Sequence, residues 1–331
     1  MLENSSLNQL RGKKNLLAFS GGVDSSALFF LLLDEDIKFD IAIVNYKQRE
    51  QSELEVNYAK ELASKYNLLC HTLVAPNIES NFEAKAREIR YDFFETLIKK
   101  HSYENLLTAH HLGDRFEWML MQFCRGAGCA EIAGMQKMQK RDAYTLVRPL
   151  LHLDKRELYS YLKENNIKYF EDATNKDKKI KRNSFRHSHT NVLLDKYLNG
   201  IKKSFEYLDS DRQTLVPEIK IEHIKELSYF KSTNNIRSDI FIIDKILKTK
   251  SYMLSFNERE LLCKQNSLVV GREFLVSFLK EFVFILPFLD AKTPMSKEFK
   301  EECRVLKVEP KMRPYLYKNI DVFKKVKELL L

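Results

Sequence analysis

A glycine-containing turn near the start of the chain is the first place where residue types and spacing could do chemistry. It reads Ser20-Gly21-Gly22-Val23-Asp24-Ser25-Ser26 and lies between the apolar runs Asn15–Phe19 and Ser25–Leu33, which predict a strand and a helix. Two glycines let the backbone turn tightly and approach a ligand, and the free N–H groups of the following helix point at the same place. The turn therefore predicts an anion site suited to phosphate. It is neither a Walker A loop nor a GxGxxG fingerprint, and a simple capped turn is the alternative.

A second group of polar residues follows the apolar run Asn105–Ala109, which predicts another strand. The segment Thr108-Ala109-His110-His111-Leu112-Gly113-Asp114-Arg115-Phe116-Glu117 places Asp114 and Glu117 three residues apart, on one face of the next helix. Such a carboxylate pair could hold Mg²⁺ or an ammonium group. His110 or His111 could serve as a base near neutral pH. The alternative is a surface carboxylate pair with capping histidines.

Alternating strand-like and helix-like segments would position both motifs. Strands are expected at Asn15–Phe19, Asp40–Val44, Leu68–Val74 and Asn105–Ala109, and helices at Ser25–Leu33, Glu53–Tyr66, Phe82–Leu97, Asp114–Cys124, Leu153–Asn165 and Asn191–Leu208. Asp154 is the expected N-cap of the helix at Leu153–Asn165. This rhythm predicts an α/β fold with a Rossmann-like, mostly parallel sheet covered by helices on both faces. Ligands of such sheets bind beyond the carboxyl ends of the strands, where both motifs would lie.

The second half of the chain differs in charge and in pattern. Residues 1–150 hold 19 Lys and Arg against 20 Asp and Glu, whereas residues 151–331 hold 36 against 26, so the basic excess lies entirely in the second half. That asymmetry suits a polyanionic partner, although a solvated basic surface would give the same numbers. The pattern predicts domains at 1–210 and 211–331, the second mostly helical with a small β element. Its expected elements are helices at Ile221–Leu227, Asp239–Thr249 and Lys297–Leu306, and a hairpin of Leu268–Val270 and Phe274–Phe278 turning at Gly271.

Composition narrows the protein class. With 331 residues, 44% hydrophobic and 31% charged, the chain can bury a sizeable core. Its five cysteines form no CxxC pair, which argues against a disulfide framework and for a reducing compartment. The longest apolar stretch, Phe282–Leu289, is too short to span a bilayer. A cytoplasmic protein with no membrane partner is expected, and a homodimer is the default oligomer.

The turn resembles the PP-loop of the N-type ATP pyrophosphatases, which grip the pyrophosphate of ATP and transfer AMP to a substrate oxygen. The order of motifs over about residues 15–190 is similar to that of the tRNA(Ile)-lysidine synthetases. The matching segments are Ala84-Lys85-Ala86-Arg87-Glu88-Ile89-Arg90-Tyr91, His110 to Glu117, Arg125-Gly126-Ala127-Gly128, Arg148-Pro149-Leu150-Leu151, Glu171-Asp172-Ala173-Thr174-Asn175 and Arg182-Asn183-Ser184-Phe185-Arg186.

The chain departs from the family pattern at three places. The segment Val44-Asn45-Tyr46-Lys47-Gln48-Arg49 stands where relatives carry histidine and glycine. Gly113 stands where an acidic residue is common, and Trp118 where threonine is common. Nucleotide contacts made by histidine in relatives are therefore not carried over to Asn45–Arg49.

The resemblance implies a reaction in which ATP adenylates the C2 oxygen of the wobble cytidine in a CAU-anticodon isoleucine tRNA. Free L-lysine then attacks C2, and AMP leaves. The implied catalytic residues are Asp24, His110, His111, Asp114 and Glu117. ATP would be bound by Ser20, Gly21, Gly22, Val23, Asp24, Ser25 and Arg125, with Asp24 as a Mg²⁺ ligand. Lysine would be bound by Asp114, Glu117 and Arg186, and tRNA by Arg87, Arg90, Lys178, Lys179, Lys181, Arg182 and Arg313.

Three other functions fit parts of the pattern. The nearest is a tRNA thiolase of the 2-thiocytidine type from the same superfamily, but such enzymes usually carry paired cysteines, and Cys124 and Cys129 are five residues apart. A small-molecule ATP-dependent synthetase would not need the basic second half. A non-catalytic RNA-binding module would not need Ser20, Asp24, Asp114 and Glu117.

Overall fold

The structure, a computed structural model, describes all residues except 49–50, 79, 81, 172–180, 216–218 and 290–293. It divides into two compact units, Met1–Asp209 and Ser210–Leu331, which are treated separately below. Within the described ranges no helix is long and apolar enough to cross a membrane.

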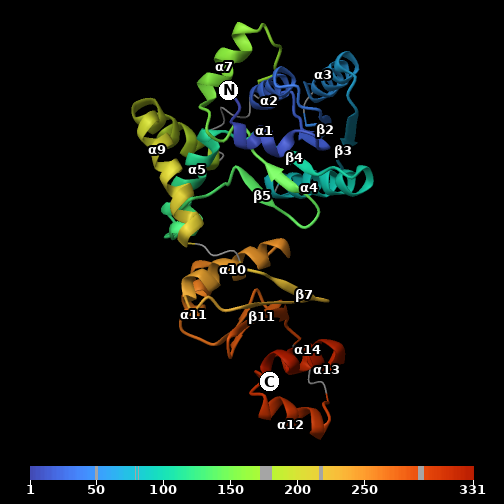
Figure 1. The fold of residues 1–331 in the computed structure, drawn as a ribbon, viewed down its shortest axis with the longest axis vertical. Helices are drawn as coiled ribbons and strands as arrows, with labels where there is room; N and C mark the ends of the chain where they lie inside the picture. Colours follow the sequence, from blue (N-terminus) through green and yellow to red (C-terminus); the bar gives the residue numbers. More distant parts are fainter. Residues whose placement is uncertain (49–50, 79, 81, 172–180, 216–218, 290–293) are drawn as a thin grey trace. The chain divides into compact units, whose positions relative to one another are not determined.

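The first unit is built on a six-stranded sheet in the order β3-β2-β1-β4-β6-β5 (Figure 1). The strands are β1 (Asn15–Ala18), β2 (Asp40–Asn45), β3 (Cys70–Val74), β4 (Asn105–Leu107), β5 (Met138–Lys140) and β6 (Thr145–Val147). All neighbouring pairs are parallel except β5 with β6, which is antiparallel. The expected α/β fold with a mostly parallel sheet is confirmed, and the antiparallel edge formed by β5 was not predicted.

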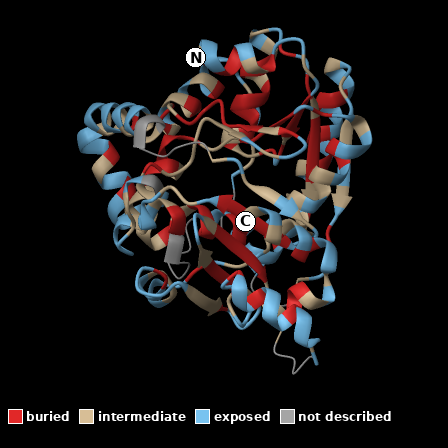
Figure 2. Cartoon of the chain, turned by 60° about the horizontal axis from the view of Figure 1, so that its bottom comes forward, coloured by how far each residue is buried: buried red, intermediate tan, exposed pale blue. Residues whose placement is uncertain are grey.

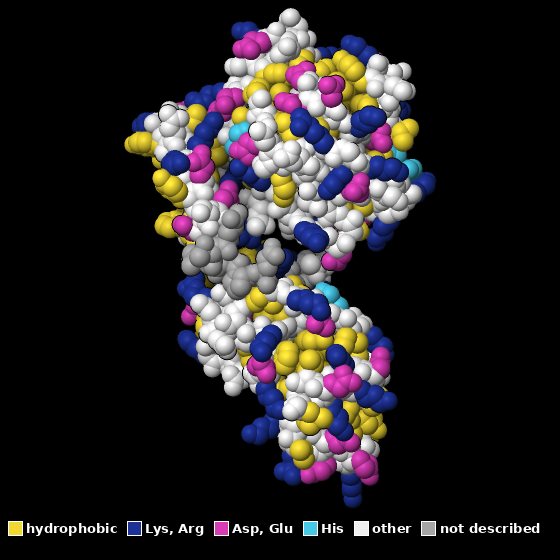
Figure 3. Space-filling view, in the orientation of Figure 1, with side chains coloured by type: hydrophobic (Ala, Val, Ile, Leu, Met, Phe, Trp, Pro, Cys, Tyr) yellow, Lys and Arg dark blue, Asp and Glu magenta, His cyan; other side chains and the backbone are white. Residues whose placement is uncertain are grey.

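Helices cover both faces of this sheet. The helical elements of this unit are α1 (Asn4–Leu10), α2 (Val23–Asp34), α3 (Gln51–Tyr66), α4 (Phe82–His101), α5 (Leu112–Phe123), α6 (Cys129–Ile132), α7 (Lys155–Glu164), α8 (Lys181–Phe185), the π-helical turn η2 (Arg186–Thr190) and α9 (Asn191–Leu215). Those that share a core with the strands are α1, α2, α3 and α7 on one face and α4 on the other, whereas α5 and α9 form a core of their own. The sheet has a hydrophobic core on each face, because successive side chains of a strand point to opposite faces. Leu17 and Leu107 face α2 and α3, whereas their neighbours Leu16 and Leu106 face α4. Buried residues accordingly line the strands and inner helix faces (Figure 2), while charged side chains of both signs cover the outside (Figure 3).

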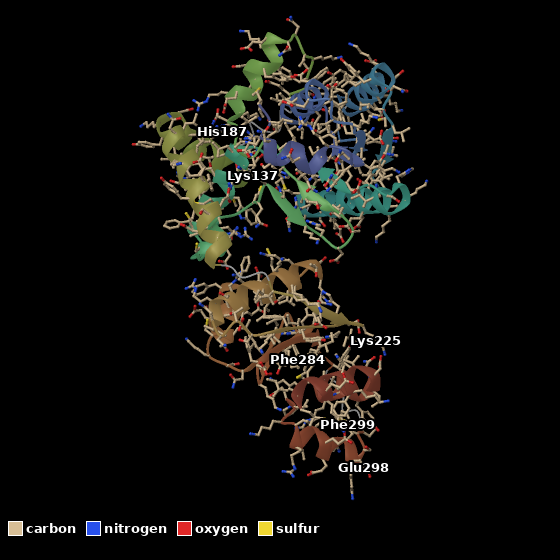
Figure 4. All side chains as sticks on the ribbon, viewed as in Figure 1. Lys137, His187, Lys225, Phe284, Glu298 and Phe299 are labelled. Atoms are coloured by element: carbon tan, nitrogen blue, oxygen red, sulfur yellow. The ribbon has the colours of Figure 1, made fainter. Side chains whose placement is uncertain are left out.

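The second unit contains a five-stranded antiparallel sheet in the order β7-β8-β11-β10-β9. Its strands are β7 (Glu222–Ile224), β8 (Leu227–Lys231), β9 (Ser267–Val270), β10 (Phe274–Leu279) and β11 (Phe282–Pro287), and its helices are α10 (Ile236–Thr249), α11 (Phe256–Leu262), α12 (Lys297–Val305), α13 (Arg313–Lys318) and α14 (Ile320–Leu330). One core joins the sheet to α10 and α11, and the other joins it to α12, α13 and α14. Within the latter, Phe299 of α12 lies against Tyr317 and Phe323, with ring centroids 5.0 and 4.7 Å apart (Figure 4).

The predicted helix at Ile221–Leu227 is wrong, because this segment holds β7 and the turn into β8. Ile221, Ile224 and Leu227 are spaced as on a helix, but Lys225 has a φ of 52°, which a helix does not allow. Cross-strand pairs such as Ile224 with Leu227 decide the local structure instead. The hairpin of β9 and β10 and the helices α10 and α12 lie where they were predicted.

Candidate functional site

The loop between β1 and α2 is preorganised by its own hydroxyl groups. The hydroxyls of Ser20 and Ser25 are 3.0 Å apart, and Ser25 Oγ also accepts the Ser20 N–H at 3.2 Å. Gly21 has a φ of +74°, and a Cβ there would lie 3.3 Å from the Phe170 ring, so glycine suits both the turn and the close approach. The Phe170 N–H donates to Gly21 O at 2.9 Å. The loop therefore holds its shape with backbone N–H groups at the start of α2, as an anion cradle requires.

Asp24, His111 and Asp114 meet beside this loop, although they come from α2 and from the N-terminal end of α5. His111 Nε2 lies 3.9 Å from Asp24 Oδ1 and 3.6 Å from Asp114 Oδ2. His111 caps α5: its Nδ1 accepts the Gly113 N–H at 3.0 Å, and its own N–H donates to Asp114 Oδ2 at 3.2 Å. A neutral His111 therefore carries its proton on Nε2, which faces the two carboxylates. This arrangement fits a positioning role better than that of a base.

Gly113, a departure from the family pattern, is explained by the same cap. A Cβ at this position would lie 2.7 Å from Cε1 of His111. Glycine thus lets the imidazole ring settle onto the first turn of α5.

Asp114 and Glu117 are joined by an arginine that is distant in sequence. Arg186 Nε donates to Glu117 Oε2 at 2.6 Å, and Arg186 Nη2 donates to Asp114 Oδ1 at 3.0 Å. The Glu117 side chain is 1% exposed and that of Arg186 is 23% exposed. Arg186 opens the π-helical turn η2, a type of element often found at functional sites. The structure thus brings together the three residues predicted to bind lysine.

Lys155 was missed by the sequence reasoning. It is the first residue of α7, and its Nζ lies 3.8 Å from Asp24 Oδ2. The only signal for Lys155 in the sequence was its place directly after the predicted cap Asp154, which does accept the Arg156 N–H at 2.9 Å.

Tyr159 lies on the same helix and donates to Glu171 at 3.3 Å. Burial, together with the charges of Glu171 and Asp24, raises the pKa of Tyr159 to about 12.

The remaining predicted residues lie elsewhere. Arg125 is exposed beyond the far end of α5, about 16 Å along the helix axis from Asp114 at 1.5 Å per residue. Arg313 donates to Val308 O through Nε and Nη2 at 3.1 and 3.0 Å, so its guanidinium is engaged in a contact within the protein. Arg87 and Arg90 are exposed on α4. Lys178 and Lys179 lie outside the described residues, and Lys181 and Arg182 belong to α8 by their backbone.

Asp24 fits the expected role in Mg²⁺ binding. Its Oδ1 is buried and accepts no hydrogen bond within the described part of the chain, which leaves a carboxylate oxygen for a cation. The described residues form no cluster of three or more His, Cys, Asp or Glu side chains able to hold a metal ion. Mg²⁺ bound by one carboxylate and by substrate phosphates is an arrangement this ion commonly adopts.

A pair of substitutions at His111 tests its positioning role. Asparagine is a good helix N-cap, so His111→Asn should keep the stability of the protein and most of its activity. His111→Ala should lower the free energy of unfolding by about 1 kcal/mol, because the cap is lost. Thermal unfolding and turnover of both variants provide the measurement. Complete loss of activity in a stable His111→Asn variant would instead identify His111 as the base.

Comparison with known proteins identifies the family of the chain. Residues 2–193 match the model of the PP-loop domain family. The chain is 43% identical over 312 residues to a tRNA(Ile)-lysidine synthase of Helicobacter pylori, covering 94% of this chain and 91% of that protein. It is 44% identical over 314 residues to the tRNA(Ile)-lysidine synthase of Campylobacter jejuni strain RM1221, covering 95% of each. A U34-tRNA thiolase, NcsA from Methanococcus maripaludis, shares the fold with a TM-score of 0.51 at 16% identity, covering 66% of this chain and 80% of that one.

Fold, loop and family match define the first unit as a PP-loop domain. With relatives above 40% identity over nearly its whole length, the chain belongs to the tRNA(Ile)-lysidine synthase family.

Proposed function

We propose that this protein is a ligase that joins free L-lysine to C2 of the wobble cytidine of an isoleucine tRNA with a CAU anticodon, using ATP. The convergence of the Ser20–Ser26 loop, Asp24, His111 and the Arg186-bridged pair Asp114–Glu117 carries this proposal. Membership of the tRNA(Ile)-lysidine synthase family supports it over the thiolase alternative.

The first step transfers AMP to the C2 oxygen of cytidine and releases pyrophosphate. The N–H groups at the start of α2 would bind the leaving phosphates, and the Lys155 ammonium beside Asp24 would add positive charge there. Asp24 would hold Mg²⁺, which when bound offsets the phosphate charge.

In the second step, the ε-amine of lysine attacks C2, and AMP leaves with the C2 oxygen. Asp114 and Glu117 would hold the amino groups of lysine. Arg186 uses two of its five N–H donors on these carboxylates, so others can receive the lysine carboxylate. The attacking amine must lose a proton, and the Nδ1 of His111 is used by its cap. We assign the role of base to His110, whose Nδ1 lies 2.9 Å from the Thr108 hydroxyl, a contact that would orient the ring.

The substrate tRNA is a polyanion whose wobble base lies in a single-stranded loop, so extruding that base is comparatively cheap. We assign residues 211–331 to tRNA binding because the basic excess of the chain lies in its second half. On the face of residues 211–331 that Figure 3 shows, basic and acidic side chains are interleaved. The positive charge on that face is therefore spread out and not gathered into one patch. A tRNA substrate also implies a cytoplasmic location.

One assay tests the function directly. The protein is incubated with ATP, Mg²⁺, labelled lysine and an unmodified CAU-anticodon isoleucine tRNA, and label in the tRNA is measured. We expect incorporation that depends on ATP and is lost when C34 is replaced by U34. A folded protein that binds this tRNA and ATP yet incorporates no lysine would contradict the proposal.

A further inference from the structure

Three arginines gather around one tyrosine on the α4 side of the sheet; this group of Arg87, Arg141, Arg148 and Tyr91 is called the arginine cluster below. The Arg87 guanidinium lies 4.6 Å from the centre of the Tyr91 ring, and its Nη2 donates to the Tyr91 hydroxyl at 3.4 Å. The Arg141 guanidinium lies 5.1 Å from the same ring. One aromatic ring thus holds two cations, one from α4 and one from the turn between β5 and β6.

Arg148 is the buried member of the cluster. It is 6% exposed, and it donates through Nη1 to Gln136 O at 2.8 Å and through Nη2 to Gln139 Oε1 at 3.4 Å. Its Nε is buried without an acceptor, and in the described ranges no carboxylate lies within ion-pair distance of it. Burial, together with Arg141 and Arg87 nearby, lowers the pKa of Arg148 to about 10. A buried cation without a carboxylate is costly for a protein to keep.

The cluster carries more positive than negative charge. Glu95 is the carboxylate that meets it, 3.6 Å from Arg141 Nη1, and it also accepts the Tyr144 hydroxyl at 3.2 Å. Arg87 is exposed and the Arg141 side chain is 31% exposed, so both can reach a partner from solvent. The surplus cations suit an anion that, among the residues the structure describes, no neighbouring side chain beyond Glu95 supplies.

We infer that the arginine cluster binds a phosphodiester of the substrate RNA, with the Tyr91 ring holding Arg87 and Arg141 in position. Two observations favour RNA over a free phosphate or the ATP phosphates. The Ser20–Ser26 loop already forms a separate phosphate cradle, and several arginines grouped in one place suit the phosphate backbone of a nucleic acid. Arg148 follows β6, which pairs in parallel with β4, so it leaves the sheet at the same edge as the segment carrying His110 and His111.

This inference rests on the proposed function, because it takes tRNA as the substrate. Of this group, Arg87 alone is expected to contact RNA from the family resemblance, whereas Arg141, Arg148 and Tyr91 are joined to it by the fold.

The test uses the full chain and unmodified CAU-anticodon tRNA. Arg141→Ala and Arg87→Ala are compared with Arg11→Ala, which removes an exposed arginine of the same unit outside the cluster. Kd values for tRNA are measured over a range of salt concentrations, and the Kd for ATP is measured in parallel. We expect each cluster variant to raise the tRNA Kd about 5- to 30-fold and to lower the magnitude of the salt slope by roughly 0.7–0.9. The Kd for ATP and the behaviour of Arg11→Ala should stay at wild-type values.

Wild-type tRNA affinity and salt slope in both folded cluster variants would overturn the inference. So would a raised Kd for ATP with unchanged tRNA binding, since the cluster would then serve the nucleotide. Failure of the proposed function can be told apart from failure of this inference. If the wild-type protein binds tRNA through Arg141 but ligates no lysine, the proposed function is contradicted and the RNA-binding role of the cluster is supported.

Discussion

Replacing Asp114 by Asn, or Glu117 by Gln, is expected to lower kcat/KM for lysine by roughly 10²- to 10³-fold, because removing one partner of a buried charged pair costs about 2–5 kcal/mol. Both changes keep the size of the side chain and remove its charge. The substrate amine would then meet the Arg186 guanidinium with only one carboxylate beside it. Affinity for tRNA and for ATP should stay close to wild type, since neither carboxylate belongs to the phosphate loop.

Folding has to be separated from lysine recognition in this test. The Glu117 side chain is 1% exposed and pairs with Arg186, so Glu117→Gln should also lower the free energy of unfolding. We expect a loss of about 1–2 kcal/mol, because the Arg186 side chain is 23% exposed and solvent weakens the ion pair. Asp142→Asn, at an exposed site of the same unit, provides the matched control and should change neither quantity. Lysine titrations of ligation, with urea unfolding of each variant, measure both effects. Equal loss of tRNA affinity would show that the pair is structural.

Much of the first unit could be predicted because its signals are local. A strand, a glycine turn and a helix follow one another within Asn15–Asp34, and the structure has them in that order. The N-cap Asp154 was likewise predicted from the residues next to it in the sequence. The edge strand β5 and its neighbour β6 were not predicted, because each spans three residues, too few to show an alternation of apolar and polar side chains.

The site includes contacts between residues that are distant in sequence, which the sequence could not reveal. The loop and the carboxylates of α5 were found from residue types and spacing. The two bonds of Arg186 join residues 69 and 72 positions apart, so no local pattern reveals them. Lys155 likewise reaches Asp24 only because α7 lies beside α2 in the fold. The role of Arg125, by contrast, came from a motif, and the structure places it beyond the opposite end of α5 from the site.

The second large effect is expected at Asp24, where Asp24→Asn should slow tRNA-dependent ATP–pyrophosphate exchange roughly 10²- to 10³-fold, the scale seen when one preorganised electrostatic group is removed. The change leaves the N–H groups of the loop in place but removes the charge that would hold Mg²⁺ and that pairs with Lys155 at 3.8 Å. Raising the Mg²⁺ concentration should recover part of the rate, because a weakened ion site is filled by mass action.

Lys155→Ala separates the two partners of Asp24. If the ammonium of Lys155 assists the leaving phosphates, this variant should lose about tenfold in exchange, the scale of one charge-assisted contact, without any change in its Mg²⁺ requirement. Lys163→Ala, an exposed lysine on the same helix, and Asp36→Asn, just beyond the end of α2, are the matched controls and should behave as wild type. Full exchange in Asp24→Asn would remove Asp24 from the ATP site. A Lys155→Ala variant whose loss is cured by Mg²⁺ would mean that the lysine acts through Asp24 and makes no phosphate contact of its own.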